Sequence, residues 1–142
     1  MKNSPLKTVV SSLIFAAVLL FAGQTTFAQT AKNKSCLAYE PAQTTLDGQL
    51  TRRAVVNASE QKETIWVVRL RAPQCVAADA GNEFNPAIER VSEVQLVLTG
   101  EQMRRFRPMI NQKITVAGTL FAAHTQHHFT EVLLIVSEMA KK

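Results

Sequence analysis

The stretch that decides the fold reads SEVQLVLTGEQMRRFRPMINQKITVAGTLFAA, residues 92–123. Its first eight residues place every second side chain from Val94 on one apolar face, which is the period of a half-buried β-strand. From Thr99 the apolar residues recur every three or four positions, and Thr99 with Gln102 fits the capping box that begins a helix. Pro108 keeps that helix short, and alternation then returns. The segment therefore predicts a strand, a short helix and a strand.

Two more strands are predicted before this segment and one after it. Their ranges are Thr44–Val56, Thr64–Ala72 and Phe129–Met139. Gly48 in the first strand and Gly118 in the fourth are typical of the sharp bends that small barrels need. We expect Pro73 to end the second strand, because proline lacks the N–H that a sheet requires.

The element order predicts an all-β fold with one short helix. Three strands, a helix and two strands resemble the OB-fold, a five-stranded Greek-key barrel, so we expect a small OB-like barrel. A small open α+β sheet is the alternative, because the order of elements along the chain does not fix which strands pair.

The beginning of the chain has the three parts of a secretory signal peptide. Two lysines precede an uncharged apolar run, and a polar stretch ends in small residues at Ala28. The alternative of a membrane anchor is less suitable, because the run is shorter than the roughly 20 residues that span a bilayer. We expect a signal peptide at 1–28, an extended lead-in at 29–43 and one domain at 44–140. The mature protein is then periplasmic or secreted and does not span a membrane.

Both cysteines of the chain, Cys36 and Cys75, fall in the part expected to be exported. In an oxidising compartment two cysteines of a small domain most simply form one disulfide, which would tether the lead-in through Cys36. A reactive thiol or a metal ligand is the alternative, although the C-x-x-C spacing of such sites is absent from this pair.

The positive charge of the mature chain is mild. Removal of residues 1–28 leaves 14 basic and 11 acidic side chains, a net charge of +3. In an OB-like barrel the ligand contacts the face of strands two and three and the loops between strands one and two and strands four and five. We expect Arg52 and Arg53 in the first loop, 51–63, and Arg69 and Arg71 on the strand face. These arginines are the candidate binding residues for an anionic ligand.

All three histidines of the chain, His124, His127 and His128, lie in the expected second loop, 122–128. With Glu131 they are candidate ligands for zinc or copper, which imidazole and carboxylate groups bind. A neutral imidazole also suits acid–base catalysis, but no serine of the mature chain stands in a nucleophile motif. A polar loop without chemistry is the third interpretation.

The segment GTLFAAHTQHHFT, Gly118 to Thr130, resembles a family of small exported bacterial proteins that is known as a domain of unknown function. VQLVLT, CLAYEPAQTTLDGQL and LRAPQCV elsewhere in the chain add to this resemblance. It implies a small exported β-domain and supplies no activity.

These observations favour a binding or accessory domain over an enzyme. The expected partner is an anionic envelope polymer or another exported protein, with no cofactor. Nucleic acid is a poor candidate, because the expected binding face lacks the aromatic side chains on which bases stack. Metal binding through the histidine segment is the alternative function.

Overall fold

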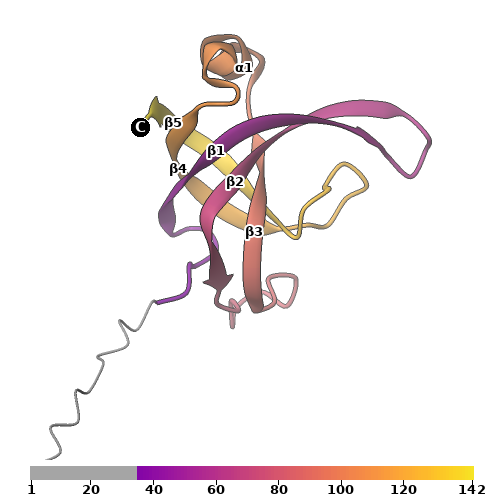
Figure 1. The fold of residues 1–142 in the computed structure, drawn as a ribbon. Helices are drawn as coiled ribbons and strands as arrows, with labels where there is room; N and C mark the ends of the chain where they lie inside the picture. The colour runs from indigo at the N-terminus through magenta and orange to yellow at the C-terminus, as the bar shows by residue number, and fades with distance from the viewer. Residues whose placement is uncertain (1–34) are drawn as a thin grey trace, which may run out of the picture. The chain divides into compact units, whose positions relative to one another are not determined.

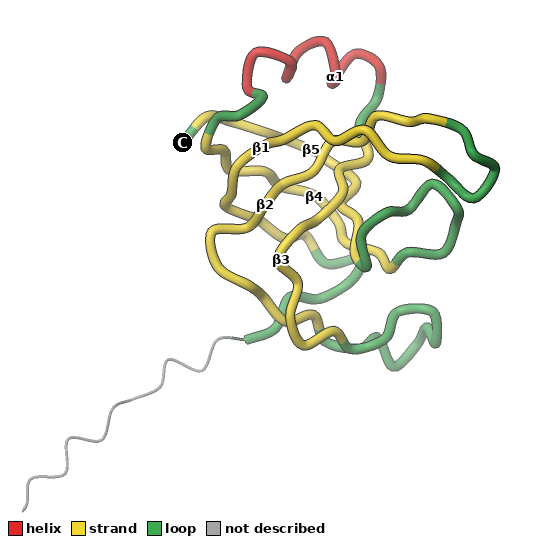
Figure 2. The backbone as a smooth tube through the Cα atoms, turned by 45° about the vertical axis from the view of Figure 1, so that its right-hand side comes forward, coloured by secondary structure: helices red, strands yellow, loops and turns green. Residues whose placement is uncertain are grey.

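The computed structural model describes residues 35–142, which form a closed five-stranded sheet with a short helix at one end (Figures 1 and 2). In chain order the elements are β1 (Gln43–Val56), β2 (Lys62–Val76), β3 (Ile88–Val97), α1 (Gly100–Phe106), the 3-10 turn η1 (Arg107–Met109), β4 (Lys113–Ala122) and β5 (Val132–Lys141). The expected signal peptide and the first part of the expected lead-in lie outside the described residues. Neither helix in residues 35–142 is long and apolar enough to cross a membrane.

The sheet closes because β1 pairs with β2 along one edge and with β4 along the other, both antiparallel. Around the ring the strand order is β1, β2, β3, β5, β4. A short parallel pairing joins Gln95–Val97 of β3 to Leu133–Ile135 of β5. The closed ring, with α1 between β3 and β4, agrees with the predicted OB-like barrel, and the alternative of an open sheet is wrong.

The apolar core fills the inside of the ring, because alternate residues of each strand point inward. Leu50, Ile114 and Leu120 are completely buried there. Phe106, the last residue of α1, is 1% exposed and belongs to the same cluster. The helix therefore covers one end of the barrel through Phe106, whereas Met103 on the same predicted apolar stripe is 39% exposed.

Gly48 and Gly118 stand where two strands approach too closely for a side chain. A Cβ atom at Gly48 would lie 2.2 Å from the carbonyl oxygen of Arg69, and one at Gly118 would lie 2.0 Å from that of Ile135. Gly118 also follows a shift in the β4–β5 register. Both positions need glycine because the neighbouring atoms belong to backbone, as the predicted bends imply.

The capping box at the start of α1 is confirmed. The Gln102 backbone N–H donates to Thr99 Oγ1 at 3.2 Å, and the Thr99 N–H donates to Gln102 Oε1 at 2.8 Å. The Gln102 side-chain amide also donates to the carbonyl oxygen of Val136 at 2.9 Å. Gln102 therefore fixes both the start of the helix and its position on β5.

The predicted end of the second strand at Pro73 is wrong, because β2 continues to Val76. The pairing with β3 shifts register between Arg69 and Gln74, and this irregularity accommodates the proline within the strand. The extension brings Cys75 to Cys36, and the predicted disulfide between them is confirmed. Backbone hydrogen bonds from Leu37 to Cys75 and from Ala77 to Leu37, both 2.8 Å, attach the lead-in to β2.

Candidate functional site

Arg52 and Arg53 lie within the paired part of β1, opposite Trp66 and Ile65 of β2. The expected loop at 51–63 is therefore wrong at both ends, since β1 extends to Val56 and β2 begins at Lys62. The strand predicted over Thr44–Val56 is correct at this end, so the two arginines belong to the strand and not to the loop. The guanidinium carbon of Arg52 lies 5.8 Å from the centre of the Trp66 ring, so this arginine covers a core residue.

Arg53 and Arg69 share one carboxylate. Arg53 Nη1 lies 3.0 Å from Glu93 Oε2, and Arg69 Nε lies 3.3 Å from Glu93 Oε1. Because these side chains are largely exposed, the pairs add little to stability. These ion pairs partly neutralise the charges of Arg53 and Arg69, two of the four predicted binding arginines.

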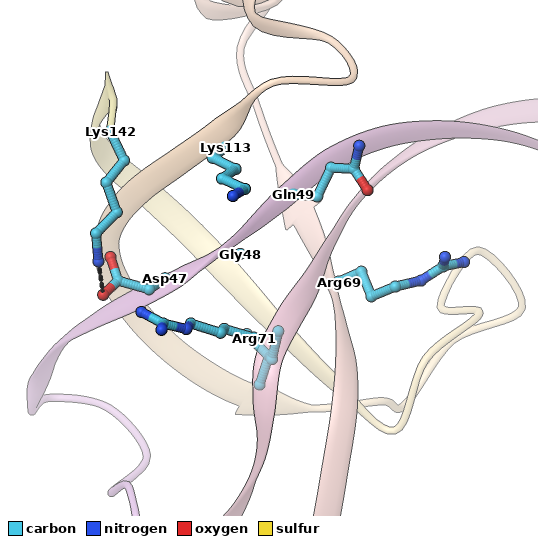
Figure 3. Close-up of a pocket in the computed structure, with 8 residues that line it drawn as sticks. Asp47, Gly48, Gln49, Arg69, Arg71, Lys113 and Lys142 are labelled. Atoms are coloured by element: carbon cyan, nitrogen blue, oxygen red, sulfur yellow. Dashed lines mark hydrogen bonds and ion pairs between the residues drawn. The ribbon is translucent and has the colours of Figure 1, made fainter.

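Arg71 lies in a basic hollow of about 460 Å³ on the outer surface of the sheet (Figure 3). The lining residues of the basic hollow come from β1, β2, β4 and the C-terminal end of the chain, and they are Asp47, Gly48, Gln49, Arg69, Leu70, Arg71, Lys113 and Lys142. In Figure 3 the Arg71 side chain extends toward Asp47, whereas the Arg69 guanidinium points away from it. Lys113 and Lys142 were not predicted, since the β1–β4 pairing brings Lys113 to this surface and the β4–β5 pairing brings Lys142 beside it.

Asp47 is the sole carboxylate among the residues that line the basic hollow, and it is already paired. It forms an ion pair with Lys142 and accepts a hydrogen bond from Thr115 Oγ1 at 2.7 Å. The hydrogen bond from Lys142, followed by that from Thr115, lowers the pKa of the Asp47 carboxyl group below its ordinary value. Within residues 35–142 neither Arg71 nor Lys113 has a salt bridge or a side-chain hydrogen bond, although the charge of Arg71 also contributes to the lowered pKa of Asp47.

The histidines lie between β4 and β5, as predicted, in a segment that we call the histidine loop, residues 123–131. Figures 1 and 2 show it on the same side of the molecule as the far end of the β1–β2 hairpin. His127 Nδ1 lies 2.7 Å from Glu63 Oε1 on that hairpin, and Ser59 Oγ donates to Gln126 Oε1 at 3.2 Å. The two binding loops of the OB-like plan therefore touch each other.

Four residues, Asn57, Glu63, Gln95 and His127, hold the hairpin and the histidine loop together, and we call them the clasp. Asn57 is 5% exposed, and its side-chain amide donates to Glu63 Oε1 at 2.6 Å. Gln95 Nε2 donates to the carbonyl oxygen of His127 at 2.9 Å, and Gln95 Oε1 accepts from the backbone N–H of Phe129 at 2.8 Å. Sequence reasoning missed Glu63 and Gln95, because their partners in the histidine loop are remote in the chain. It also missed Asn57, although the partners of Asn57 lie within the same turn.

The histidine loop also covers apolar side chains on the outer face of the sheet. Val67, Gln95 and Leu133 are neighbours across β2, β3 and β5, on the opposite parity to the barrel core. All three are nevertheless buried, with Val67 1% and Leu133 0% exposed. Since Gln95 bonds directly to the histidine loop, this small outer core is closed by the loop.

Of the four candidate metal ligands, the structure brings only His124 and His128 together. The rings of His124 and His128 pack edge to face with their centres 4.7 Å apart. His127 is instead paired with Glu63, and the charge of Glu131 contributes to the raised pKa of Tyr39. Residues 35–142 contain no group of three or more His, Cys, Asp or Glu side chains placed to hold a metal ion. The geometry therefore lends no support to a zinc or copper site.

Hydrogen bonds fix the proton positions in two of the rings. His124 Nδ1 lies 3.0 Å from the carbonyl oxygen of Ala122, which can only accept, so Nδ1 carries the proton. His128 Nδ1 accepts from the His124 backbone N–H at 3.0 Å, which leaves the proton of the neutral ring on Nε2. Burial, and then the charges of His124 and His127, lower the pKa of His128 below its ordinary value. The local structure thus favours neutral His128.

Residues 93–140 match a domain of unknown function, DUF4431. The match runs from the second half of β3 to the end of β5, and it includes α1, the histidine loop and Lys113. The resemblance carried by Gly118 to Thr130 lies within this range, so it is confirmed. No curated protein matches the chain.

Proposed function

We propose that the chain is an exported binding domain, rather than an enzyme, and that its basic hollow holds a segment of an anionic envelope polymer. The observation that carries this proposal is the excess positive charge of the basic hollow, where Arg69, Arg71, Lys113 and Lys142 outnumber the single carboxylate of Asp47. Arg71 and Lys113 line this hollow without a salt bridge in residues 35–142, whereas Lys142 forms an ion pair with Asp47. An excess of positive charge in a concave surface attracts anionic groups.

The proposal changes the set of binding residues. The central cations are now Arg71, Lys113 and Lys142. Arg69 also lines the hollow, but it forms a salt bridge with Glu93. Arg52 and Arg53 are given the lesser roles of covering Trp66 and pairing with Glu93. A nucleic acid is the less suitable polyanion, because none of the residues lining the basic hollow is aromatic and bases would lack a stacking surface.

Export is part of the proposal and has its own support. The Cys36–Cys75 disulfide is the kind of bond that persists in the periplasm or outside the cell. The sequence of residues 1–28 supplies the signal peptide for such a location. An envelope polymer carrying phosphate or carboxylate groups would meet the basic hollow in that compartment.

The test uses a short fluorescein-labelled heparin oligosaccharide as a generic polyanion and fluorescence anisotropy as the measurement. The double variant Arg71→Gln/Lys113→Gln should bind at least about tenfold more weakly, since each lost charge-assisted contact contributes about 1.5 kcal/mol or more. Arg90→Gln/Arg104→Gln, which removes the same charge from exposed positions elsewhere, is the matched control. Equal losses in both double variants would show attraction to net charge alone and would contradict the proposed site.

A further inference from the structure

A second concave surface differs in character from the basic hollow. It is an open groove of about 490 Å³, which we call the acidic groove, between the segment before β3 and the junction of β4 with the histidine loop. Its lining is apolar apart from two carboxylates, and it consists of Phe84, Pro86, Ala87, Ile88, Glu89, Ala122, Ala123 and Glu131. No lysine or arginine lines it, although the chain as a whole is basic.

Phe84 stands at this groove with 72% of its surface exposed. A large aromatic side chain in water is unfavourable by itself and is typical of a binding surface. Most other phenylalanine and tryptophan side chains in residues 35–142 are better covered: Trp66 is 7% and Phe106 1% exposed. The exposure of Phe84 is therefore a local feature that the packing of the barrel does not explain.

The segment that carries Phe84 is firmly held. The backbone N–H of Phe84 donates to Asn82 Oδ1 at 3.0 Å, and the buried Asn85 accepts from the Ala122 N–H through its Oδ1 at 3.3 Å. Tyr39 Oη donates to the carbonyl oxygen of Pro86 at 2.9 Å. Because these contacts fix the backbone on both sides of Phe84, its ring is presented at little further cost in conformational entropy.

The charges of the acidic groove are also unsatisfied. Neither Glu89 nor Glu131 forms a salt bridge or a side-chain hydrogen bond within residues 35–142, and both are exposed. Glu131 lies close enough to Tyr39 for its charge to contribute to the raised pKa of that phenol, after burial.

We propose that the acidic groove is a docking surface for a basic, extended segment of a partner protein. A lysine or arginine side chain has an aliphatic stem that packs on Phe84 and Ile88 and a charged end that reaches Glu89 or Glu131. The open form of the groove suits consecutive side chains of a peptide. This surface is independent of the basic hollow, with which it shares no lining residue.

The test measures binding of a fluorescein-labelled peptide with alternating lysine and leucine by anisotropy, with the alternating glutamate–leucine peptide as its counterpart. The lysine peptide should bind and the glutamate peptide should not. Phe84→Ala should weaken binding about tenfold, as truncation of an aromatic anchor does, and Glu89→Gln/Glu131→Gln should weaken it to a similar extent. Glu101→Gln/Glu138→Gln, two exposed carboxylates outside the groove, is the matched control and should leave binding unchanged.

Thermal unfolding of each variant identifies any loss of fold, which is not expected because all the substituted side chains are exposed. Equal binding of both peptides, or unchanged binding by Phe84→Ala, would overturn the proposal. Displacement of the lysine peptide by millimolar tetramethylammonium would also overturn it, because the groove would then take a small organic cation. The heparin measurement on the same variants should not change, so failure of one site is distinguishable from failure of the other.

Discussion

The barrel interior is stabilised by apolar burial, whereas the clasp is stabilised by polar contacts. Inside the ring, apolar side chains from all five strands and α1 form one cluster, in which Leu50, Ile114 and Leu120 are fully buried. The clasp instead relies on a few polar contacts, of which the His127–Glu63 pair is about half exposed on the histidine side. Apolar burial of this extent determines whether the chain folds. Exposed polar pairs contribute far less, so the clasp determines mainly where the two loops lie.

Removing a core side chain should therefore produce the largest effect. Phe106→Ala deletes a ring that is 1% exposed and closes one end of the barrel. We expect the free energy of unfolding in urea to fall by about 3–5 kcal/mol, as for other buried phenylalanines. Met103→Ala on the same helix, where the side chain is 39% exposed, is the control and should cost below about 1 kcal/mol. Similar losses of unfolding free energy in the two variants would contradict the view that burial in the barrel interior determines stability.

Gln95→Ala tests the buried part of the clasp. The substitution leaves the His127 carbonyl oxygen and the Phe129 N–H without their partners, which should cost about 2 kcal/mol. The decisive measurement is hydrogen exchange, which should accelerate at Phe129 more than at Leu50 in the barrel. Gln74→Ala, which removes a glutamine with one exposed hydrogen bond, is the control. Uniform acceleration across both regions would mean that the clasp and the barrel unfold as one unit.

The barrel was largely predictable from the sequence, because its signals are local. The change of period at Thr99 places α1, and the two glycines mark positions where strands approach closely. The apolar run Val132–Val136 of β5 is typical of a strand buried on both faces; Leu133 and Leu134 are fully buried, whereas Ile135 is 46% exposed. Each of these features depends on residues a few positions apart, so pattern and propensity carry the information.

The proposed binding surfaces were less predictable, because they depend on which strands pair. Glu63 and His127 are separated by 64 positions, and no pattern in either segment indicates the other. Lys113 lines the same hollow as Arg71 because β4 pairs with β1 when the ring closes. The loop expected at 51–63 overlapped the strand predicted to end at Val56, and the structure supports the strand, because Arg52 and Arg53 lie within β1.

Glu63→Gln examines the exposed part of the clasp. Loss of the carboxylate weakens its contacts with His127 and Asn57, and we expect a decrease in the free energy of unfolding of less than about 1 kcal/mol. A double-mutant cycle with His127→Gln isolates the pair from other effects. Glu60→Gln, on the same hairpin and without a side-chain contact to the loop, is the control. A coupling energy above about 2 kcal/mol would contradict the view that this pair only positions the loops.

The pH dependence of His128 should give the smallest effect. Its folded-state pKa lies below the ordinary 6.5, because burial and the neighbouring histidines disfavour the charged ring. The unfolded chain therefore binds more protons just below pH 6.5, and stability should decline as the pH falls from that value through the folded pKa. The lowered pKa of Asp47 acts in a separate window below about 4. Urea unfolding of His128→Asn should lack the first decline. His124→Asn removes only one of the lesser causes of the lowered pKa and keeps the His128 ring, so it should retain most of the decline. If His128→Asn retains the decline in full, another group is responsible, and neutral His128 does not contribute to holding the histidine loop against the outer face.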